Sequence, residues 1–241
     1  MTINTKTLAA IDIGTNAIRL FISNVEEYPT ETLFKKIAFL RVPIRLGEDV
    51  FTTGEIGQQK RKRLCETMQG FSYIMSAFNV ESYKAYATCA MREARNGKSV
   101  AEQIQKECDL NIEIISGTKE AETIFAGGMN EVVDDDKTYL YVDVGGGSTE
   151  VIVYSKSVKI EACSFPLGTV RMLNDAVDKE EMKHFKKWLK NITEKYTPDA
   201  IIGSGGNINK IHKLLNKKER ERITYQELDI LYEYMKSFNL E

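Results

Sequence analysis

The sequence of 241 residues has few of the residues that mark metal-binding, disulfide-rich or membrane-spanning proteins. It contains one tryptophan and two histidines, and its four cysteines form no CxxC pair. A structural zinc site is therefore not indicated, and free thiols in a reducing cytoplasm are the simplest interpretation. No apolar run approaches the roughly 18–20 residues that cross a bilayer, and none near the N-terminus is typical of a secretory signal. We expect a cytoplasmic protein without a membrane partner.

The sequence also lacks a strong net charge of either sign, with 33 Lys and Arg residues against 35 Asp and Glu residues. This balance gives no reason to expect nucleic-acid binding. Hydrophobic residues make up 42% and charged residues 28% of the chain, an ordinary globular composition that excludes disorder. Residues 183–222 are the exception, because they hold eleven Lys or Arg residues and four Asp or Glu residues. A solvated helix face and a basic track that attracts a polyanion explain this segment equally well.

Glycine placement reveals an approximate internal repeat. Residues 8–22 predict an apolar strand with Asp12 near its end, a turn with the sequence GTN, and a second apolar strand. Residues 139–154 repeat this scheme, with Asp143 near the end of the first strand and the sequence GGGST in the turn. A third strand is predicted after each hairpin, over residues 32–42 and 157–164. The period of about 130 residues indicates two related α/β domains.

Strands and helices alternate along the rest of the chain, which predicts an α/β fold with mixed sheets. Helices are predicted over residues 54–78, 100–108, 118–129, 179–196, 208–215 and 225–238, and further strands over residues 82–88, 111–115 and 200–203. The acidic residues 134–136 mark the best domain boundary. We therefore predict an N-terminal domain over residues 1–133 and a C-terminal domain over residues 134–241.

Three short turns combine glycine with a hydroxyl side chain. They lie at residues 12–16, 143–148 and 203–207, and their hydroxyls belong to Thr15, Ser148 and Ser204. Glycine lets backbone N–H groups converge on an anion, and hydroxyls add further donors. None of the turns fits the Walker or Rossmann spacing, so a different phosphate-binding scaffold is favoured. Tight hairpins in which glycine serves only the turn geometry are the alternative.

Charged residues near these turns point to chemistry on phosphate. Asp12 and Asp143 would repel a bare phosphate, whereas a divalent cation, or a water next to one, suits carboxylates in this position. Arg92 follows a predicted strand, where its guanidinium suits phosphate oxygens; a surface salt bridge is the other explanation. Glu120 lies in the first turn of a predicted helix, where a carboxylate can take a proton from attacking water. Capping of the helix N-terminus explains Glu120 about equally well.

Taken in order, these segments resemble the exopolyphosphatase and guanosine pentaphosphate phosphohydrolase family, a branch of the actin-like ATPase fold. The matching segments are residues 11–20, 87–96, 117–127, 142–151, 164–172 and 203–210. The resemblance implies two ribonuclease H-like domains, each with a mixed β-sheet flanked by helices, and a cleft between the domains.

The resemblance also implies roles for individual residues. Glu120 matches the catalytic base that activates water, and Arg92 matches the arginine that grips the substrate phosphate. Asp143 and Glu150 match acidic residues associated with Mg²⁺ and water, and we add Asp12 as a metal ligand. The expected phosphate contacts are Thr15, Asn16, Gly145, Gly146, Gly147 and Ser148, joined by Ser204 and Gly205 of the third turn. These roles imply Mg²⁺-assisted hydrolysis of the terminal phosphate of inorganic polyphosphate.

Two departures from the family pattern limit this expectation. Asn207 stands where the family commonly has threonine. Members of the short type also continue beyond this length, so we expect an incomplete second domain whose apolar surface favours a homodimer or low stability. Three other functions stay open: a guanosine pentaphosphate phosphohydrolase, an ATP-dependent sugar kinase or chaperone-like ATPase, and a non-catalytic sensor of a phosphorylated nucleotide.

Overall fold

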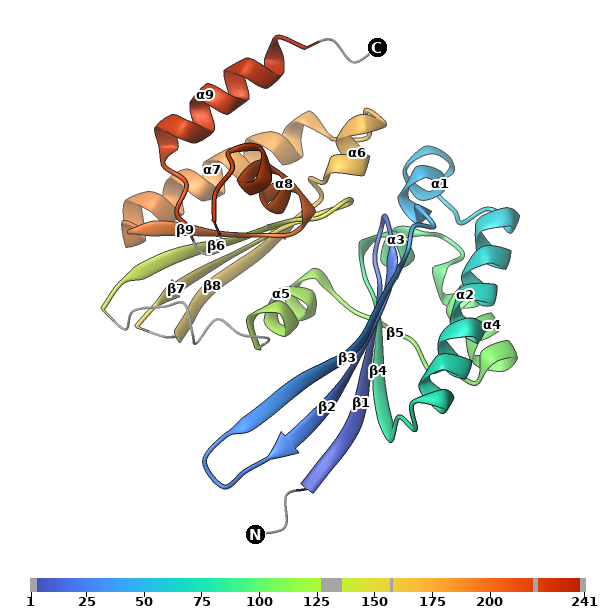
Figure 1. Cartoon of the computed structure of the whole chain (residues 1–241). Coiled ribbons are helices and arrows are strands. Elements are labelled where there is room, and N and C mark those ends of the chain that lie inside the picture. Colours follow the sequence, from blue (N-terminus) through green and yellow to red (C-terminus); the bar gives the residue numbers. More distant parts are fainter. Residues whose placement is uncertain (1–3, 127–135, 157, 219–220, 239–241) are drawn as a thin grey trace.

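The computed structural model describes residues 4–126, 136–156, 158–218 and 221–238 (Figure 1). The strands are β1 (Asn4–Ile13), β2 (Ile18–Glu27), β3 (Thr32–Val42), β4 (Ser82–Ala87), β5 (Glu113–Ile114), β6 (Thr138–Val144), β7 (Thr149–Ser155), β8 (Val158–Phe165) and β9 (Ala200–Ser204). The helices are α1 (Leu46–Thr53), α2 (Gln58–Ala77), α3 (Cys89–Glu93), α4 (Gly97–Cys108), α5 (Gly117–Ala126), α6 (Thr169–Leu173), α7 (Lys179–Tyr196), α8 (Gly206–Leu214) and α9 (Tyr225–Lys236). Two mixed sheets flanked by helices confirm the predicted fold class.

The two sheets begin with the same connectivity, as the internal repeat predicts. In the first sheet β1, β2 and β3 form an antiparallel meander, and β4 joins parallel to β1. In the second sheet β6, β7 and β8 form the meander, and β9 joins parallel to β6. The full strand orders are β3-β2-β1-β4-β5 and β8-β7-β6-β9. Each sheet therefore presents a hairpin turn at the end of its first strand.

Alternation along the strands gives the first sheet one core face and one open face. Ile11 and Leu20 point to the core face, where they pack with Leu64 and Met68 of α2. Asp12, between Ile11 and the turn, belongs to the opposite face of the pleat. Helices α2 and α4 cover only the core face, as Figure 1 shows. The open face of the sheet is therefore free to line a site.

Both faces of the second sheet are covered. On one face Val151 and Val153 pack with Ile192 of α7. On the other face Ile152 packs with Ala121 of α5 and with tyrosines of β6 and β7. Helix α5 comes earlier in the chain than any strand of this sheet, yet it packs against β7 and β8. The predicted domain boundary at residues 133 and 134 lies outside the described residues and stays a prediction.

Three short helices, α1, α3 and α6, were not predicted from the periodicity. The predicted helix over residues 54–78 begins later, at Gln58, because Gly54 adopts a left-handed conformation with φ 79° and ends α1. Helix α7 has the predicted bounds, and its first turn is capped by the Asp178 side chain, which accepts from the Glu180 N–H at 2.9 Å.

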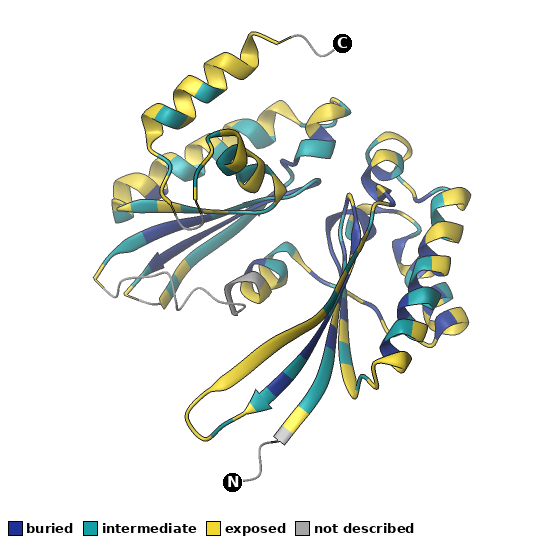
Figure 2. Ribbon diagram, viewed as in Figure 1, coloured by how far each residue is buried: buried dark blue, intermediate teal, exposed yellow. Residues whose placement is uncertain are grey.

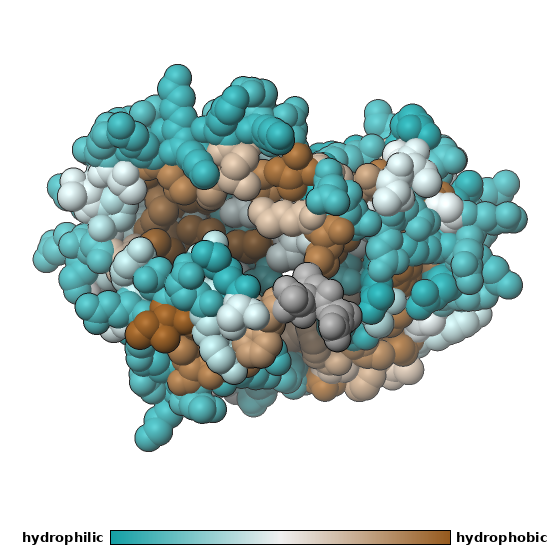
Figure 3. Space-filling view, turned by 90° about the horizontal axis from the view of Figure 1, so that it is seen from above, coloured by the Kyte–Doolittle hydropathy of each residue, from teal (hydrophilic) through white to brown (hydrophobic). Residues whose placement is uncertain are grey.

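The surface of α9 is largely exposed (Figure 2). Its exposed apolar residues include Leu228, Ile230 and Met235. Seen from above, the surface of the molecule shows hydrophobic side chains among hydrophilic ones (Figure 3). Among the described helices, none combines the length and the hydrophobicity that crossing a bilayer requires.

Replacing Ile152 with alanine tests the contact between α5 and the second sheet. Ile152 is 0% exposed, so Ile152→Ala leaves a cavity, and we expect the free energy of unfolding to fall by about 2–5 kcal/mol in urea titrations. Ile160→Ala makes the same change at a residue of β8 that is 45% exposed, and it should alter stability by less than about 0.5 kcal/mol. Equal losses for the two variants would contradict this account of the core.

Candidate active site

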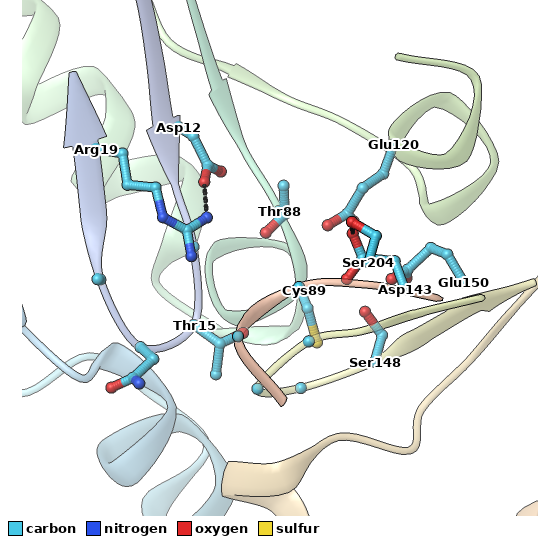
Figure 4. A pocket seen from close by; sticks show the side chains of 18 of the residues that line it. Asp12, Thr15, Arg19, Thr88, Cys89, Glu120, Asp143, Ser148, Glu150 and Ser204 are labelled. Carbon is cyan, nitrogen blue, oxygen red and sulfur yellow. Dashed lines mark hydrogen bonds and ion pairs between the residues drawn. The ribbon is translucent and has the colours of Figure 1, made fainter. Parts of the chain in front are cut away.

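A cavity of about 700 Å³ opens where the turns of the two sheets meet. It is lined by every predicted site residue except Arg92: Asp12, Thr15, Asn16, Glu120, Asp143, Gly145, Gly146, Gly147, Ser148, Glu150, Ser204 and Gly205. Figure 4 shows Glu120, Asp143, Glu150 and Ser204 gathered on one side of the cavity, with Asp12 and Arg19 on the other. Segments far apart in the sequence thus form one site.

The first turn connects β1 to β2 and is held from behind by the start of α1. The carbonyls of Thr15 and Asn16 accept from the N–H groups of Gly47 and Arg45, both at 2.9 Å. The side chain of Thr15 is buried at the floor of the cavity. These hydrogen bonds hold the turn from the α1 side, and the backbone groups on its cavity side take no part in them.

The second turn connects β6 to β7 and is held in the same way by α6. The N–H groups of Thr169 and Val170 donate to the carbonyls of Gly145 and Gly146, at 3.0 and 2.8 Å. In a trans peptide the N–H points opposite to the C=O. The N–H groups of Gly146 and Gly147 therefore point away from α6, toward the cavity, where they suit an anion.

The two turns face each other at close range. A Cβ on Gly146 would lie 3.1 Å from Thr15 Cγ2, and one on Gly147 would lie 2.9 Å from Thr15 Oγ1. A Cβ on Gly168 would collide with the backbone of Gly146 from behind. Close approach therefore favours glycine at Gly147 and Gly168 in particular, which a hairpin alone does not demand.

The third turn follows β9 and supports Asp143. Ser204 Oγ donates to Asp143 Oδ2 at 3.2 Å, and Asn207 Nδ2 donates to the Val144 carbonyl at 3.1 Å. Gly205 has φ 93°, and a Cβ there would lie 2.8 Å from Asp143 Oδ1. Asn207, which departs from the family pattern, therefore still ties this turn to β6.

Burial dominates the electrostatics of the carboxyl groups in the cavity. It raises the pKa of Asp12, Asp143 and Glu150 above their ordinary values. Hydrogen bonds from Ser148 and Ser164 act in the opposite direction on the pKa of Glu150. Arg19 acts in the opposite direction on the pKa of Asp12, because Arg19 Nη1 lies 2.7 Å from Asp12 Oδ2 and stabilises the ionised carboxylate.

Glu120 is the carboxyl group of the cavity that binds a proton near neutral pH. Burial, and then the nearby Glu150 charge, raise the pKa of Glu120 from 4.5 to about 7, while Arg92 acts to lower it. Arg92 Nη1 lies 3.4 Å from Glu120 Oε2 and donates to the Ile115 carbonyl at 2.9 Å. A carboxylate that binds a proton near neutral pH is suited to general-base chemistry.

The acidic side chains fit a divalent cation that is shared with a substrate. Asp143 and Glu150 are direct cross-strand partners, so their side chains emerge side by side on one face. Mg²⁺ commonly uses one or two carboxylates and completes its octahedron with water and phosphate oxygens. In the described ranges no three His, Cys, Asp or Glu side chains form a group that could hold a metal ion. Asp12, already paired with Arg19, is the least suited of the three predicted ligands.

Three cations of the first sheet line the cavity and were not predicted. They are Arg19, Arg41 and Lys84, from β2, β3 and β4. Arg19 is the cross-strand partner of both Asp12 and Arg41, so these side chains share the open face of the sheet. The alternation of β2 beyond the turn was the signal that places Arg19 beside Asp12.

Comparison with known proteins decides the family. The model of the Ppx/GppA phosphatase family matches residues 22–240. The chain belongs to the Ppx/GppA phosphatase family. A bifunctional 3-dehydroquinate synthase/phosphatase of Fusobacterium nucleatum is 32% identical over 168 residues, which cover 68% of this chain and 25% of that protein. A putative exopolyphosphatase of Haemophilus influenzae is 25% identical, with 95% of this chain and 74% of that protein covered.

Solved structures of the Ppx/GppA family share the fold. The crystal structure of the Aquifex aeolicus family member superimposes with a TM-score of 0.75 at 25% identity, over 98% of this chain and 80% of that one. This Ppx/GppA chain spans only a quarter of the length of the Fusobacterium protein that it matches.

Replacing Gly168 with alanine tests the support of the second turn. The new Cβ would collide with the backbone of Gly146, so we expect Gly168→Ala to displace the turn and lower Tm by several degrees. Gly70→Ala is the matched control, because nothing lies within 4 Å of a Cβ at Gly70 in α2. Thermal melts compare the variants, and an unchanged Tm for Gly168→Ala would contradict the close approach.

A pH series of thermal melts tests the proton affinity of Glu120. Because its pKa is raised from 4.5 to about 7, the native state binds more protons than the unfolded state in this window, and stability falls as pH rises through it. Glu120→Gln removes this loss, so we expect the variant to gain several degrees in Tm over the wild type between about pH 4.5 and 7.5. Glu122→Gln, on the same helix but 46% exposed, should show no such gain. Parallel Tm curves for Glu120→Gln and the wild type would refute the raised pKa.

Proposed function

We propose that this Ppx/GppA chain hydrolyses the terminal phosphoanhydride bond of inorganic polyphosphate, with Glu120 as the general base. The observation that carries the proposal is the position of Glu120. Its carboxyl group, with a pKa of about 7, lines the same cavity as two glycine turns whose N–H groups suit phosphate oxygens. The name of the Haemophilus influenzae relative, a putative exopolyphosphatase, agrees with this substrate class.

The reaction needs little covalent chemistry from the protein. Glu120 takes a proton from a water as the water oxygen forms a bond to the terminal phosphorus. The bond from that phosphorus to the bridging oxygen breaks, and the shortened chain keeps the electron pair. The N–H groups of Gly146 and Gly147 and the hydroxyl of Ser148 stabilise the charge on the transferred group. Arg92 keeps a fraction of Glu120 ionised near neutral pH.

A divalent cation, with Mg²⁺ as the expected one, would be held by Asp143 and Glu150, with Asp12 at the opposite side of the cavity. When bound, it supplies charge neutralisation for the phosphate oxygens. Ser204 and Ser164 orient the two carboxylates by hydrogen bonds of 3.2 and 2.9 Å. Asp143 and Glu150 are therefore the proposed ligands, whereas Asp12 is already paired with Arg19.

The cations of the open sheet face favour a long polyanion as substrate. Arg19, Arg41 and Lys84 line the cavity beyond the turns and can neutralise successive phosphates. Guanosine pentaphosphate is the second candidate, because Tyr86 also lines the cavity and offers a ring to a base. Binding of this nucleotide without turnover would instead favour a sensor, and ATP hydrolysis an ATPase of the same fold.

Phosphate release measured with Mg²⁺ tests the proposal. We expect release from short polyphosphate, and Glu120→Gln should lower kcat by about 10²–10⁴-fold because the base is lost. Below pH 7 the wild-type kcat should fall about tenfold per pH unit as Glu120 becomes protonated, and Glu120→Gln should lack this limb. Removal of the metal by a chelator should lower the rate as well.

The matched control is Glu122→Gln, which removes an exposed carboxylate from the same helix and should leave kcat within about twofold. The same assay with guanosine pentaphosphate and with ATP ranks the substrates. If Glu120→Gln kept the wild-type rate, Glu120 would not be the base. No release from any of the three substrates would refute the hydrolase proposal itself.

A further inference from the structure

One buried arginine joins the two halves of the molecule directly behind the cavity. Arg171 lies on α6, after the second sheet, and is 9% exposed. Its Nη2 lies 2.6 Å from both carboxylate oxygens of Glu93, which ends α3 in the first half. Arg171 belongs to the segment of residues 164–172 that resembles the family, and the proposed reaction gives Arg171 itself no role.

The same guanidinium reaches the second glycine turn. Arg171 Nε donates to the carbonyl of Gly147 at 2.9 Å, and its Cζ lies 4.2 Å from the ring centroid of Phe51 in α1. Cys89 Sγ, at the start of α3, lies 3.6 Å from Nη2. One side chain thus contacts α1, α3 and the turn, and its planar fork of N–H donors is what allows this.

Helix α3 connects this arginine to the candidate base. Glu93, which holds Arg171, is next in sequence to Arg92, which lies 3.4 Å from Glu120. The second turn and Arg92, the cation beside Glu120, are therefore set relative to each other through two neighbouring residues of one short helix. A shift of α3 would change both.

We propose that the Arg171–Glu93 ion pair is a latch that positions the second glycine turn against the first half of the molecule and thereby sets its distance from the first turn and from Arg92. Arg171 is then a positioning residue, which acts through the Gly147 peptide and not by touching the substrate. The part of the inference that concerns catalysis rests on the proposed function.

The energetics of such a pair agree with a geometric role. Burying the Arg171 guanidinium costs desolvation, whereas the Glu93 side chain is 36% exposed, so an apolar pair of similar volume often supports the fold equally well. What the apolar pair cannot replace is the bond to the Gly147 carbonyl. A misplacement of about 1 Å near a reacting group can lower a rate about 100-fold.

Three variants separate positioning from stability. Arg171→Lys keeps the charge but loses the fork and Nε, and Glu93→Gln keeps the shape but loses the charge. The double variant Arg171→Met, Glu93→Leu keeps an apolar contact, in case the single variants fold poorly. The control is Arg95→Lys, at an exposed pair with Glu55 just after α3.

Two measurements are made on each protein. Steady-state kinetics with tripolyphosphate and Mg²⁺ give kcat and KM, and hydrogen exchange followed by mass spectrometry gives the protection of residues 144–150. We expect kcat to fall about 10- to 100-fold in Arg171→Lys, Glu93→Gln and the double variant, with KM changed less than about threefold. Exchange of residues 144–150 should be about tenfold faster in them, and unchanged in Arg95→Lys.

The outcomes are distinct. Unchanged exchange in both single variants would show that there is no latch. Faster exchange with wild-type kcat would show that the pair has only a structural role, which overturns the positioning claim. If the wild-type protein releases no phosphate, the proposed function fails, and the latch is then decided by the exchange data alone.

Discussion

Four carboxyl groups from separate parts of the chain face one cavity, and burial raises the pKa of each. Folding brings them together against their mutual repulsion, and the chain offers only partial compensation, through Arg19 beside Asp12 and Arg92 beside Glu120. Four buried carboxyl groups with few neighbouring cations lower the stability of the folded protein. The same groups are useful for chemistry, because they can bind a metal cation or accept a proton. The rest of the architecture serves to keep these groups in place: two sheets, each ending its first strand at a turn, and helices that hold each turn from outside.

The two turns are held by the same device although they differ in sequence. In each half, N–H groups at the start of a helix donate to the carbonyls of the turn, from α1 in the first half and from α6 in the second. The inner peptide N–H groups are thereby left facing the cavity. The close approach of Thr15 to Gly146 and Gly147 then makes the two turns a single binding surface. Neither half could provide this surface alone, so the arrangement of the halves is part of the site.

Local features of the sequence were sufficient to predict the two turns and the strand meanders that carry them. The turns carry their signature in five residues, and the meanders follow from alternation, so the fold class and most of the cavity lining could be predicted. Helices α3 and α6, of five residues each, depend on the contacts that surround them and have no periodicity to detect. The Arg171–Glu93 contact joins residues 78 positions apart, which no local pattern encodes. Arg92 was expected at the substrate phosphate, yet its guanidinium meets Glu120 and the Ile115 carbonyl and does not line the large cavity. Its role at the phosphate stays a prediction.

The packing of α5 gives the site an asymmetry. Glu120 belongs structurally with the second sheet, because its neighbour Ala121 packs on Ile152. Arg92 belongs with the first half, because α3 packs into the first hydrophobic core. If the two halves moved apart, Glu120 would lie farther from the Arg92 guanidinium but would stay next to Glu150. Its affinity for a proton would then increase, and the carboxyl would become neutral. A protonated carboxyl group cannot take a proton from water, so the contact with Arg92 across the two halves helps to keep Glu120 in the ionised form that a general base requires.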